Sequence, residues 1–352
     1  MDYKKEVEEL ILEVIQQNGS DLHISAGRAS AIRVAGELVS LLKRTTPSKE
    51  DMKSILSELI GKEKLDLFLQ KKEVDFAYDF QGKARLRGNA FFQKGVISIA
   101  LRLIPKVKTL ADLKLPPLLE TFARKKQGFF LIVGPVGQGK STTMAAMVDL
   151  INTERAEHIV TIEEPVEYLF EPKRSMIDQR EVGIDTQDFN IALKSIFRED
   201  VNVIMIGEMR SPETIATAVT AAETGHLVLS TLHTNNAAQT IDRIVDSFAP
   251  SQQAQIRAQL SNSLLGIFSQ RLVPRISGGQ VPAYELLINN NAVANLIREN
   301  RTHEIDVVIE TGFENGMIDM NRSLLELVRA GEITMENAYL YSMNPKSLER
   351  LA

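Results

Sequence analysis

The sequence predicts an α+β domain followed by an α/β domain with a mostly parallel sheet. Helix-like and strand-like segments mix without strict alternation up to residue 104. A polar, proline-marked stretch at residues 105–117 is typical of a linker. From residue 118 to residue 352, short apolar runs are separated by helix-compatible segments, as in parallel strands covered by helices.

The composition indicates a soluble globular protein. The chain has 352 residues, of which 44% are hydrophobic and 25% are charged. It has no cysteine, which excludes disulfides and cysteine-ligated zinc and is consistent with an intracellular setting. It has neither a signal-peptide core nor an apolar run near the ~20 residues of a membrane span. A net charge of −5 argues against direct, non-specific nucleic-acid binding.

In the first domain, residues 3–17 carry apolar side chains at intervals of three and four, which predicts a helix. Two more helices are expected at residues 52–60 and 62–71. Strands are expected at residues 22–25, 32–34, 75–78, 84–89 and 97–103.

In the second domain, the strand candidates are residues 129–133, 159–162, 203–206, 227–231 and 284–288. Helices are expected at residues 142–151, 292–299, 304–311, 321–330 and 335–341. This order of segments favours a parallel sheet that is followed by a helical C-terminal region.

The most specific motif is a glycine-rich loop of the form GxxxxGK(S/T) between a predicted strand and a predicted helix. It consists of Gly134, Pro135, Val136, Gly137, Gln138, Gly139, Lys140, Ser141 and Thr142. Glycines let backbone N–H groups turn inward around an anion, and the helix N-terminus adds unpaired donors. The motif predicts that Lys140 reaches the β- and γ-phosphates of ATP and that Ser141 contacts Mg²⁺.

Carboxylates follow two of the predicted strands. Glu163 and Glu164 come after residues 159–162, and Glu208 comes after residues 203–206. Ligands of open α/β sheets bind at the carboxyl ends of the strands, so these acids are expected near the phosphate loop. Glu208 is the first candidate for activating water, Glu163 is a second catalytic candidate, and Glu164 is expected to support Mg²⁺ hydration.

Two of the five histidines, His226 and His233, flank the predicted strand 227–231. Such histidines can sense the γ-phosphate or couple hydrolysis to motion by hydrogen bonding and protonation. The alternative is a pair of hydrogen-bonded structural histidines.

Together these motifs resemble the type IV pilus retraction ATPases (PilT-type) of the secretion ATPase superfamily. TIEEPVEY at 161–168 is similar to the family's aspartate box, and IGEMR at 206–210 is similar to its glutamate-containing Walker B motif. TGHLVLSTLHTNNA at 224–237 resembles its histidine box. AVANLIRE at 292–299 resembles the retraction motif AIRNLIRE, with Ala294 in place of arginine. SDLHISAG at 20–27 also matches, so the resemblance spans nearly the whole chain.

The resemblance implies a homohexameric ring of subunits, each with an N-terminal PAS-like domain and a C-terminal RecA-like ATPase domain. It implies that ATP binds between the two domains and that Arg85, Arg87 and Arg102 approach the phosphates, a task for which arginine is well suited. It also implies a cytoplasmic motor, peripheral to the inner face of the cell membrane at the pilus base. There it would act on a platform protein. A second retraction ATPase is a further partner that the resemblance allows.

Three alternatives remain open at this stage. The chain could be an accessory retraction ATPase, or an extension or secretion ATPase of the same superfamily. It could be a nucleotide-gated binding module with little turnover. A nucleic-acid translocase is disfavoured by the acidic charge balance.

Overall fold

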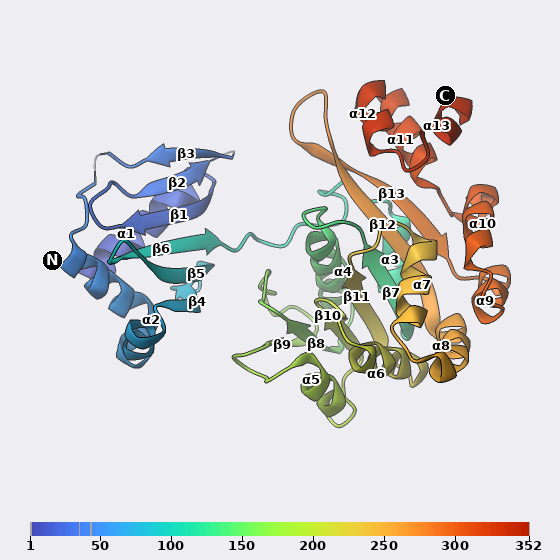
Figure 1. Ribbon diagram of the computed structural model, residues 1–352, viewed down its shortest axis with the longest axis horizontal. Coiled ribbons are helices and arrows are strands. Elements are labelled where there is room, and N and C mark those ends of the chain that lie inside the picture. Colours follow the sequence, from blue (N-terminus) through green and yellow to red (C-terminus); the bar gives the residue numbers. More distant parts are fainter. Residues whose placement is uncertain (1, 35, 43, 352) are drawn as a thin grey trace. The chain divides into compact units, whose positions relative to one another are not determined.

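The computed structural model describes residues 2–34, 36–42 and 44–351. Contacts divide the chain into two compact units, Met1–Lys106 and Val107–Ala352 (Figure 1). The domain limits at residues 104 and 117 stay a prediction. Residues 107–117, expected within a linker, pack on the second unit: Leu110 and Leu115 are buried, and Lys114 pairs with Glu332 at 2.8 Å.

The first unit is a six-stranded antiparallel sheet in the order β3-β2-β1-β6-β5-β4. Its strands are β1 (Gly19–Ser25), β2 (Ala31–Val34), β3 (Glu37–Ser40), β4 (Glu73–Phe80), β5 (Ala84–Gln93) and β6 (Val96–Leu103). Helices α1 (Tyr3–Gln16) and α2 (Lys49–Lys71) contribute their apolar faces to its core. Gly61 has a non-helical φ of 76° inside α2, at the point between the two helices predicted from the sequence.

The second unit is built on a seven-stranded sheet in the order β13-β12-β7-β11-β10-β8-β9. Its strands are β7 (Gly128–Val133), β8 (His158–Glu163), β9 (Met176–Glu181), β10 (Val203–Ile206), β11 (Leu227–Leu232), β12 (Leu264–Pro274) and β13 (Gln280–Ile288). All neighbours are parallel except β12 and β13. The carboxyl ends of five central strands therefore meet at one edge.

Helices cover both faces of this sheet, which explains why β7 is buried along its whole length. The side chains of Phe130 and Ile132 pack towards α3 (Leu118–Ala123) and α4 (Lys140–Glu154), while those of Phe129 and Leu131 face the opposite core. The helices of that opposite face are α5 (Phe189–Ile196), α6 (Pro212–Glu223), α7 (Ala237–Asp246), α8 (Pro250–Ser263), α9 (Asn291–Arg298) and α10 (Ile305–Thr311).

The C-terminal helices form a smaller core against the far ends of β12 and β13. They are α11 (Met320–Arg329), α12 (Met335–Tyr341) and α13 (Pro345–Leu351), preceded by the short 3₁₀ turns η1 (Thr302–Glu304) and η2 (Phe313–Asn315). Asn337 Nδ2 donates to the carbonyl of Pro274 at 3.1 Å, and Arg275 pairs with Glu332 at 2.6 Å. The end of the β12–β13 ribbon is thus fixed to these helices.

This architecture confirms the predicted fold class, an α+β unit followed by an α/β unit with a mostly parallel sheet and a helical C-terminal region. The five strand candidates of the second domain are present as β7, β8, β10, β11 and part of β13. Strands β3, β9 and β12 were not predicted from the sequence. Within the described parts of the chain, no helix combines the length and the apolar character that a membrane crossing requires.

Gly134 and Gly137 offer a test of how tightly β7 and the following loop pack on β12. A Cβ on Gly134 would lie 2.4 Å from the carbonyl oxygen of Gln270, whereas a Cβ on Gly137 would meet nothing within 4 Å. Both glycines have positive φ, so Gly137→Ala carries only the backbone strain of about 1 kcal/mol. We expect Gly134→Ala to lower the free energy of unfolding by about 2–4 kcal/mol, measured by urea denaturation. Equal losses in the two variants would contradict this close packing.

Candidate functional site

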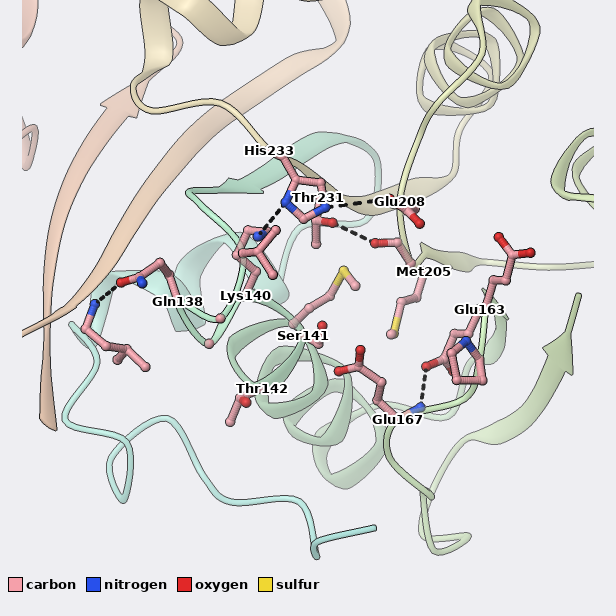
Figure 2. A pocket seen from close by; sticks show the side chains of 18 residues that line it. Gln138, Lys140, Ser141, Thr142, Glu163, Glu167, Met205, Glu208, Thr231 and His233 are labelled. Carbon is pink, nitrogen blue, oxygen red and sulfur yellow. Dashed lines mark hydrogen bonds and ion pairs between the residues drawn. The ribbon is translucent and has the colours of Figure 1, made fainter. Parts of the chain in front are cut away.

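A cleft of about 450 Å³ opens at the carboxyl edge of the sheet (Figure 2). The loop after β7, the acids after β8 and β10, and His233 after β11 all line it. The sheet thus brings together side chains that lie up to a hundred residues apart in the sequence. This is the edge at which parallel α/β sheets bind ligands.

The phosphate loop leads from β7 into α4, as its sequence pattern predicts. Gly139 adopts a left-handed φ of 77° immediately before α4 begins at Lys140. The first N–H groups of any α-helix have no partner within the helix, so those at the start of α4 face the loop. The dipole of the 15-residue α4 adds partial positive charge at this point. The arrangement is a binding site for an anion such as phosphate.

The Lys140 ammonium is buried in the middle of this loop and makes three contacts. Its Nζ donates to the carbonyl oxygens of Gly134 at 2.9 Å and Pro135 at 2.8 Å, and it lies 3.1 Å from His233 Nδ1 (Figure 2). An ammonium group has three donors, so each has an acceptor here. Burial lowers the pKa of Lys140 to about 8, against the opposing charges of Glu167 and Glu208.

The Gln138 side chain ties the loop to β12. The side-chain Oε1 of Gln138 accepts a hydrogen bond from the backbone N–H of Leu272 at 2.7 Å. The backbone carbonyl of Gln138 accepts a second one from Gln270 Nε2 at 2.8 Å. Gln270 Oε1 in turn accepts from the Thr143 hydroxyl at 2.6 Å, so the amide connects the loop to α4. Both the side chain and the backbone of Gln138 therefore fix the loop.

Glu163 is the last residue of β8, and its carboxylate is buried. The Thr161 hydroxyl donates to its Oε1 at 2.7 Å, Gln179 Nε2 donates at 3.3 Å, and the backbone N–H of Glu167 donates to its Oε2 at 3.3 Å. Burial raises the pKa of Glu163 in spite of these donors. A carboxylate with a raised pKa accepts a proton more readily than an ordinary one.

Glu208 follows β10 and lies among cationic and polar neighbours. Its carboxylate forms an ion pair with Arg210, and His233 Nε2 lies 3.6 Å from its Oε2. Arg210 also pairs with Glu164 at 3.3 Å, so the acids of two neighbouring strands share one guanidinium. Glu164 and Glu208 line the same cleft as Glu163.

His233 joins the phosphate loop to Glu208. Because the Lys140 ammonium can only donate, His233 Nδ1 is the acceptor, and a neutral ring then carries its proton on Nε2, towards Glu208. Partial burial lowers the pKa of His233, and the charge of Lys140 lowers it further, so both effects favour the neutral ring. The neutral imidazole can relay a change at the phosphate loop to the carboxylate.

His226 lies at the amino end of β11, the opposite end from His233. Its Nδ1 is 3.0 Å from the carbonyl oxygen of Ala221, and its ring meets Phe197 edge-on. The expectation that both histidines lie near the phosphates is therefore wrong for His226 within its own subunit. One strand has two ends, and only the carboxyl end reaches the cleft.

Arg85, Arg87 and Arg102 belong to the first unit, on neighbouring strands of its sheet. Arg87 and Arg102 are direct cross-strand partners, and Arg102 pairs with Asp21 at 2.8 Å. Their approach to a nucleotide stays a prediction.

The cleft supplies oxygen ligands of the kind that Mg²⁺ prefers. Ser141 contributes a hydroxyl from the first turn of α4, and Glu164 and Glu208 contribute carboxylates. Among the described residues, no three His, Cys, Asp or Glu side chains form a cluster able to hold a metal ion by themselves. This donor set fits an ion that keeps several waters and shares phosphate oxygens, as Mg²⁺ does in nucleotide sites.

Several residues of the site were missed in the sequence. The Tyr168 hydroxyl lies 2.7 Å from that of Thr142, a contact that ties the segment after Glu163 to α4. Glu167 lines the cleft, and Arg210 bridges two acids. Tyr168 and Glu167 lie inside the TIEEPVEY motif and Arg210 inside IGEMR, so the motifs held the signal but not the individual roles.

Comparison with known proteins identifies the family. Residues 3–305 match the family described as type II/IV secretion system protein. The chain is 42% identical over 334 residues to the type IV pilus retraction ATPase PilT of Pseudomonas aeruginosa, covering 95% of this chain and 97% of that protein. It is 37% identical to the type IV pilus ATPase PilU of the same organism, covering 97% and 90%.

Solved structures agree with the sequence comparisons. The crystal structure of the pilus retraction motor PilT with bound ADP superimposes with a TM-score of 0.92 at 43% identity and covers 98% of this chain and 99% of that one. The ATPase DotB of Legionella pneumophila superimposes with a TM-score of 0.79 at 25% identity, covering 95% and 94%. This chain therefore belongs to the type II/IV secretion system protein family, in the branch that contains PilT.

Proposed function

We propose that this chain is a Mg²⁺-dependent ATPase that powers the retraction of type IV pili. One observation carries the proposal. The Lys140 ammonium, His233 and four carboxylates line one cleft at a phosphate loop, in a chain that resembles PilT over nearly its whole length. The ADP bound to the PilT crystal structure supports a nucleotide as the ligand.

The phosphate loop binds the triphosphate of ATP through backbone N–H groups and the Lys140 charge. Arriving phosphate oxygens compete with the carbonyls of Gly134 and Pro135 for the ammonium. The exchange favours phosphate because a charge-assisted bond to an anion is stronger than one to a neutral carbonyl. Ser141, Glu164 and Glu208 are the residues that would hold Mg²⁺, which would supply charge neutralisation at the phosphates.

We infer that Glu163 is the general base, whereas the sequence alone ranked Glu208 first for this role. Arg210 holds the Glu208 carboxylate by an ion pair at the rim of the cleft, which fixes the direction of this side chain. Glu163 is buried, and burial raises the pKa of this group towards the working pH. We assign proton abstraction from the attacking water to Glu163, and orientation of the metal waters to Glu208.

The working assembly is a ring of six copies, with Arg85, Arg87 and Arg102 contacting nucleotide phosphates on domain closure. The rings of the resembling family support this assembly. We place the ring at the cytoplasmic face of the cell membrane at the pilus base, where ATP is available, and its mechanical partner there is a membrane-embedded platform protein. A second ATPase of the PilU type is a further partner.

Substitutions test the division of roles at the site. Lys140→Ala should abolish ATP turnover through loss of nucleotide binding. Glu163→Gln should abolish turnover while the Kd of a non-hydrolysable ATP analogue changes less than about threefold, because only the base is removed. Glu208→Gln should also abolish turnover at ordinary Mg²⁺ and shift the Mg²⁺ midpoint of analogue binding upwards. Phosphate release near the normal rate in any of the three variants contradicts that residue's assignment.

The lowered pKa of Lys140 predicts a pH dependence of binding. With a pKa of about 8, the ammonium is charged at pH 7 and loses its proton as the pH rises through 8. The Kd of a non-hydrolysable analogue should therefore rise up to about tenfold per pH unit above pH 8. Lys140→Arg, which stays charged, should show a flat profile between pH 7 and 9.5. A flat profile in the natural protein would rule out the shift.

Deletion of the gene in the source cell tests the biological role. Loss of a retraction motor should leave surface pili that persist or accumulate, with twitching motility lost. Pili are counted by electron microscopy, and a Lys140→Ala allele should reproduce the deletion. Bald cells would instead indicate an assembly motor.

A further inference from the structure

Strand β12 extends beyond its neighbour β7 and has a free edge there. Its pairing with β7 ends at Ser269 opposite Val133, whereas its pairing with β13 continues to Pro274 opposite Gln280. Beyond Ser269, one side of β12 therefore meets the phosphate loop in place of a strand. Backbone groups at such an edge need other partners.

The even-numbered residues of this segment hold the phosphate loop. Gln270 donates to the Gln138 carbonyl at 2.8 Å and accepts from Thr143 at 2.6 Å. The backbone N–H of Leu272 donates to Gln138 Oε1 at 2.7 Å. The Leu272 N–H therefore donates across the free edge of β12 to the loop, and not to its ladder partner Pro282 on β13.

Two side chains of the same ribbon, Ser269 on β12 and Glu285 on β13, hold the loop that carries His233. The Ser269 hydroxyl donates to the Asn235 carbonyl at 2.8 Å. The direct cross-strand partner of Ser269 is Glu285, whose Oε1 accepts the backbone N–H of Ala237, the first residue of α7, at 2.8 Å. These two neighbouring side chains thus fix both ends of the three-residue stretch after Thr234. Period-two alternation along the strand explains why one segment serves two loops.

We propose that Glu285 is a positioning residue for ATP hydrolysis. It holds the loop of residues 233–236 so that His233 stays in contact with Lys140, whose own loop is bonded to β12. This inference rests on the proposed function. Glu285 touches none of the residues of the phosphate loop, and acts through the first turn of α7 and residues 233–236. Its carboxylate is almost fully buried, so loss of its acceptor leaves a buried N–H without a partner and releases the start of α7.

A neutral side chain should suffice at this position. Burial raises the pKa of Glu285 to about 7, and the charges of Asp306 and Asp319 add to the shift while Arg271 opposes it. The protonated acid is thus well populated at neutral pH, and it accepts from Ala237 as an amide would. Glu285→Gln keeps the acceptor, whereas Glu285→Leu keeps a similar volume and removes it.

The test measures ATP hydrolysis by the assembled full-length protein, normalised to the folded fraction from thermal unfolding. Glu285→Leu should lower kcat by about tenfold or more with the KM for ATP within about threefold, because the phosphate loop is untouched while His233 moves. Glu285→Gln should keep kcat within about twofold. A folded Leu variant with natural kcat, or a Gln variant as impaired as the Leu variant, overturns the proposal.

A second readout does not depend on turnover. The backbone amides of residues 235–237, followed by hydrogen–deuterium exchange, should be protected in the natural protein because Glu285 accepts from Ala237 and Ser269 holds Asn235. Protection should fall in Glu285→Leu and persist in Glu285→Gln; unchanged protection in the Leu variant contradicts the positioning role. If the Leu variant does not fold, Ser269→Ala, which removes the other anchor of the same loop, must show the same loss of protection. A natural protein that fails to hydrolyse ATP but shows these changes in exchange would refute the proposed function, while the contact by which Glu285 holds the loop would stand.

Discussion

The candidate site depends on the three contacts of one buried ammonium group. Lys140 donates to two carbonyls of its own loop and lies against His233, which comes from the neighbouring strand β11. The ring nitrogen on the other side of His233 faces Glu208 after β10. Lys140 is buried and the His233 side chain is 41% exposed, so the line runs from the interior of the loop to the open side of the cleft, and each group constrains the next. A phosphate that draws the ammonium towards itself therefore acts on the histidine and, through it, on the carboxylate.

The sheet makes this line possible, because parallel strands deliver their carboxyl ends to one edge. Four strands contribute the loop, Glu163, Glu208 and His233, and helices on both faces keep the strands dry and fixed. The edge alone does not set the spacing between loops, since loops after strands are free to adopt several paths. Side chains of β12 and β13 limit that freedom from the outer side of the sheet.

The sequence predicts the parts of this site that depend on local pattern. The phosphate loop has a fixed spacing, and Glu163, Glu208 and His233 directly follow apolar runs, so strand ends locate them. His226 flanks the same strand, and a pattern that is symmetric about the strand cannot tell which end reaches the cleft. Strand β12 escaped prediction because Gly266, Ser269, Gln270 and Arg271 interrupt its apolar run. Most of those polar residues are present to hold other loops, a reason that is visible only in three dimensions. The same holds for Gln138 and Glu285, whose partners lie 134 and 48 residues away.

The length of β12 has a mechanical consequence. At one end of its segment beyond β7 the strand is bonded to the phosphate loop, and at the other end Pro274 and Arg275 are bonded to the C-terminal helices. A hydrogen-bonded ribbon is stiff along its axis, so it works as a rod between the two. A force on the C-terminal helices would be transmitted along β12 to the phosphate loop. A displacement of that loop on phosphate release would be transmitted along the same strand to those helices.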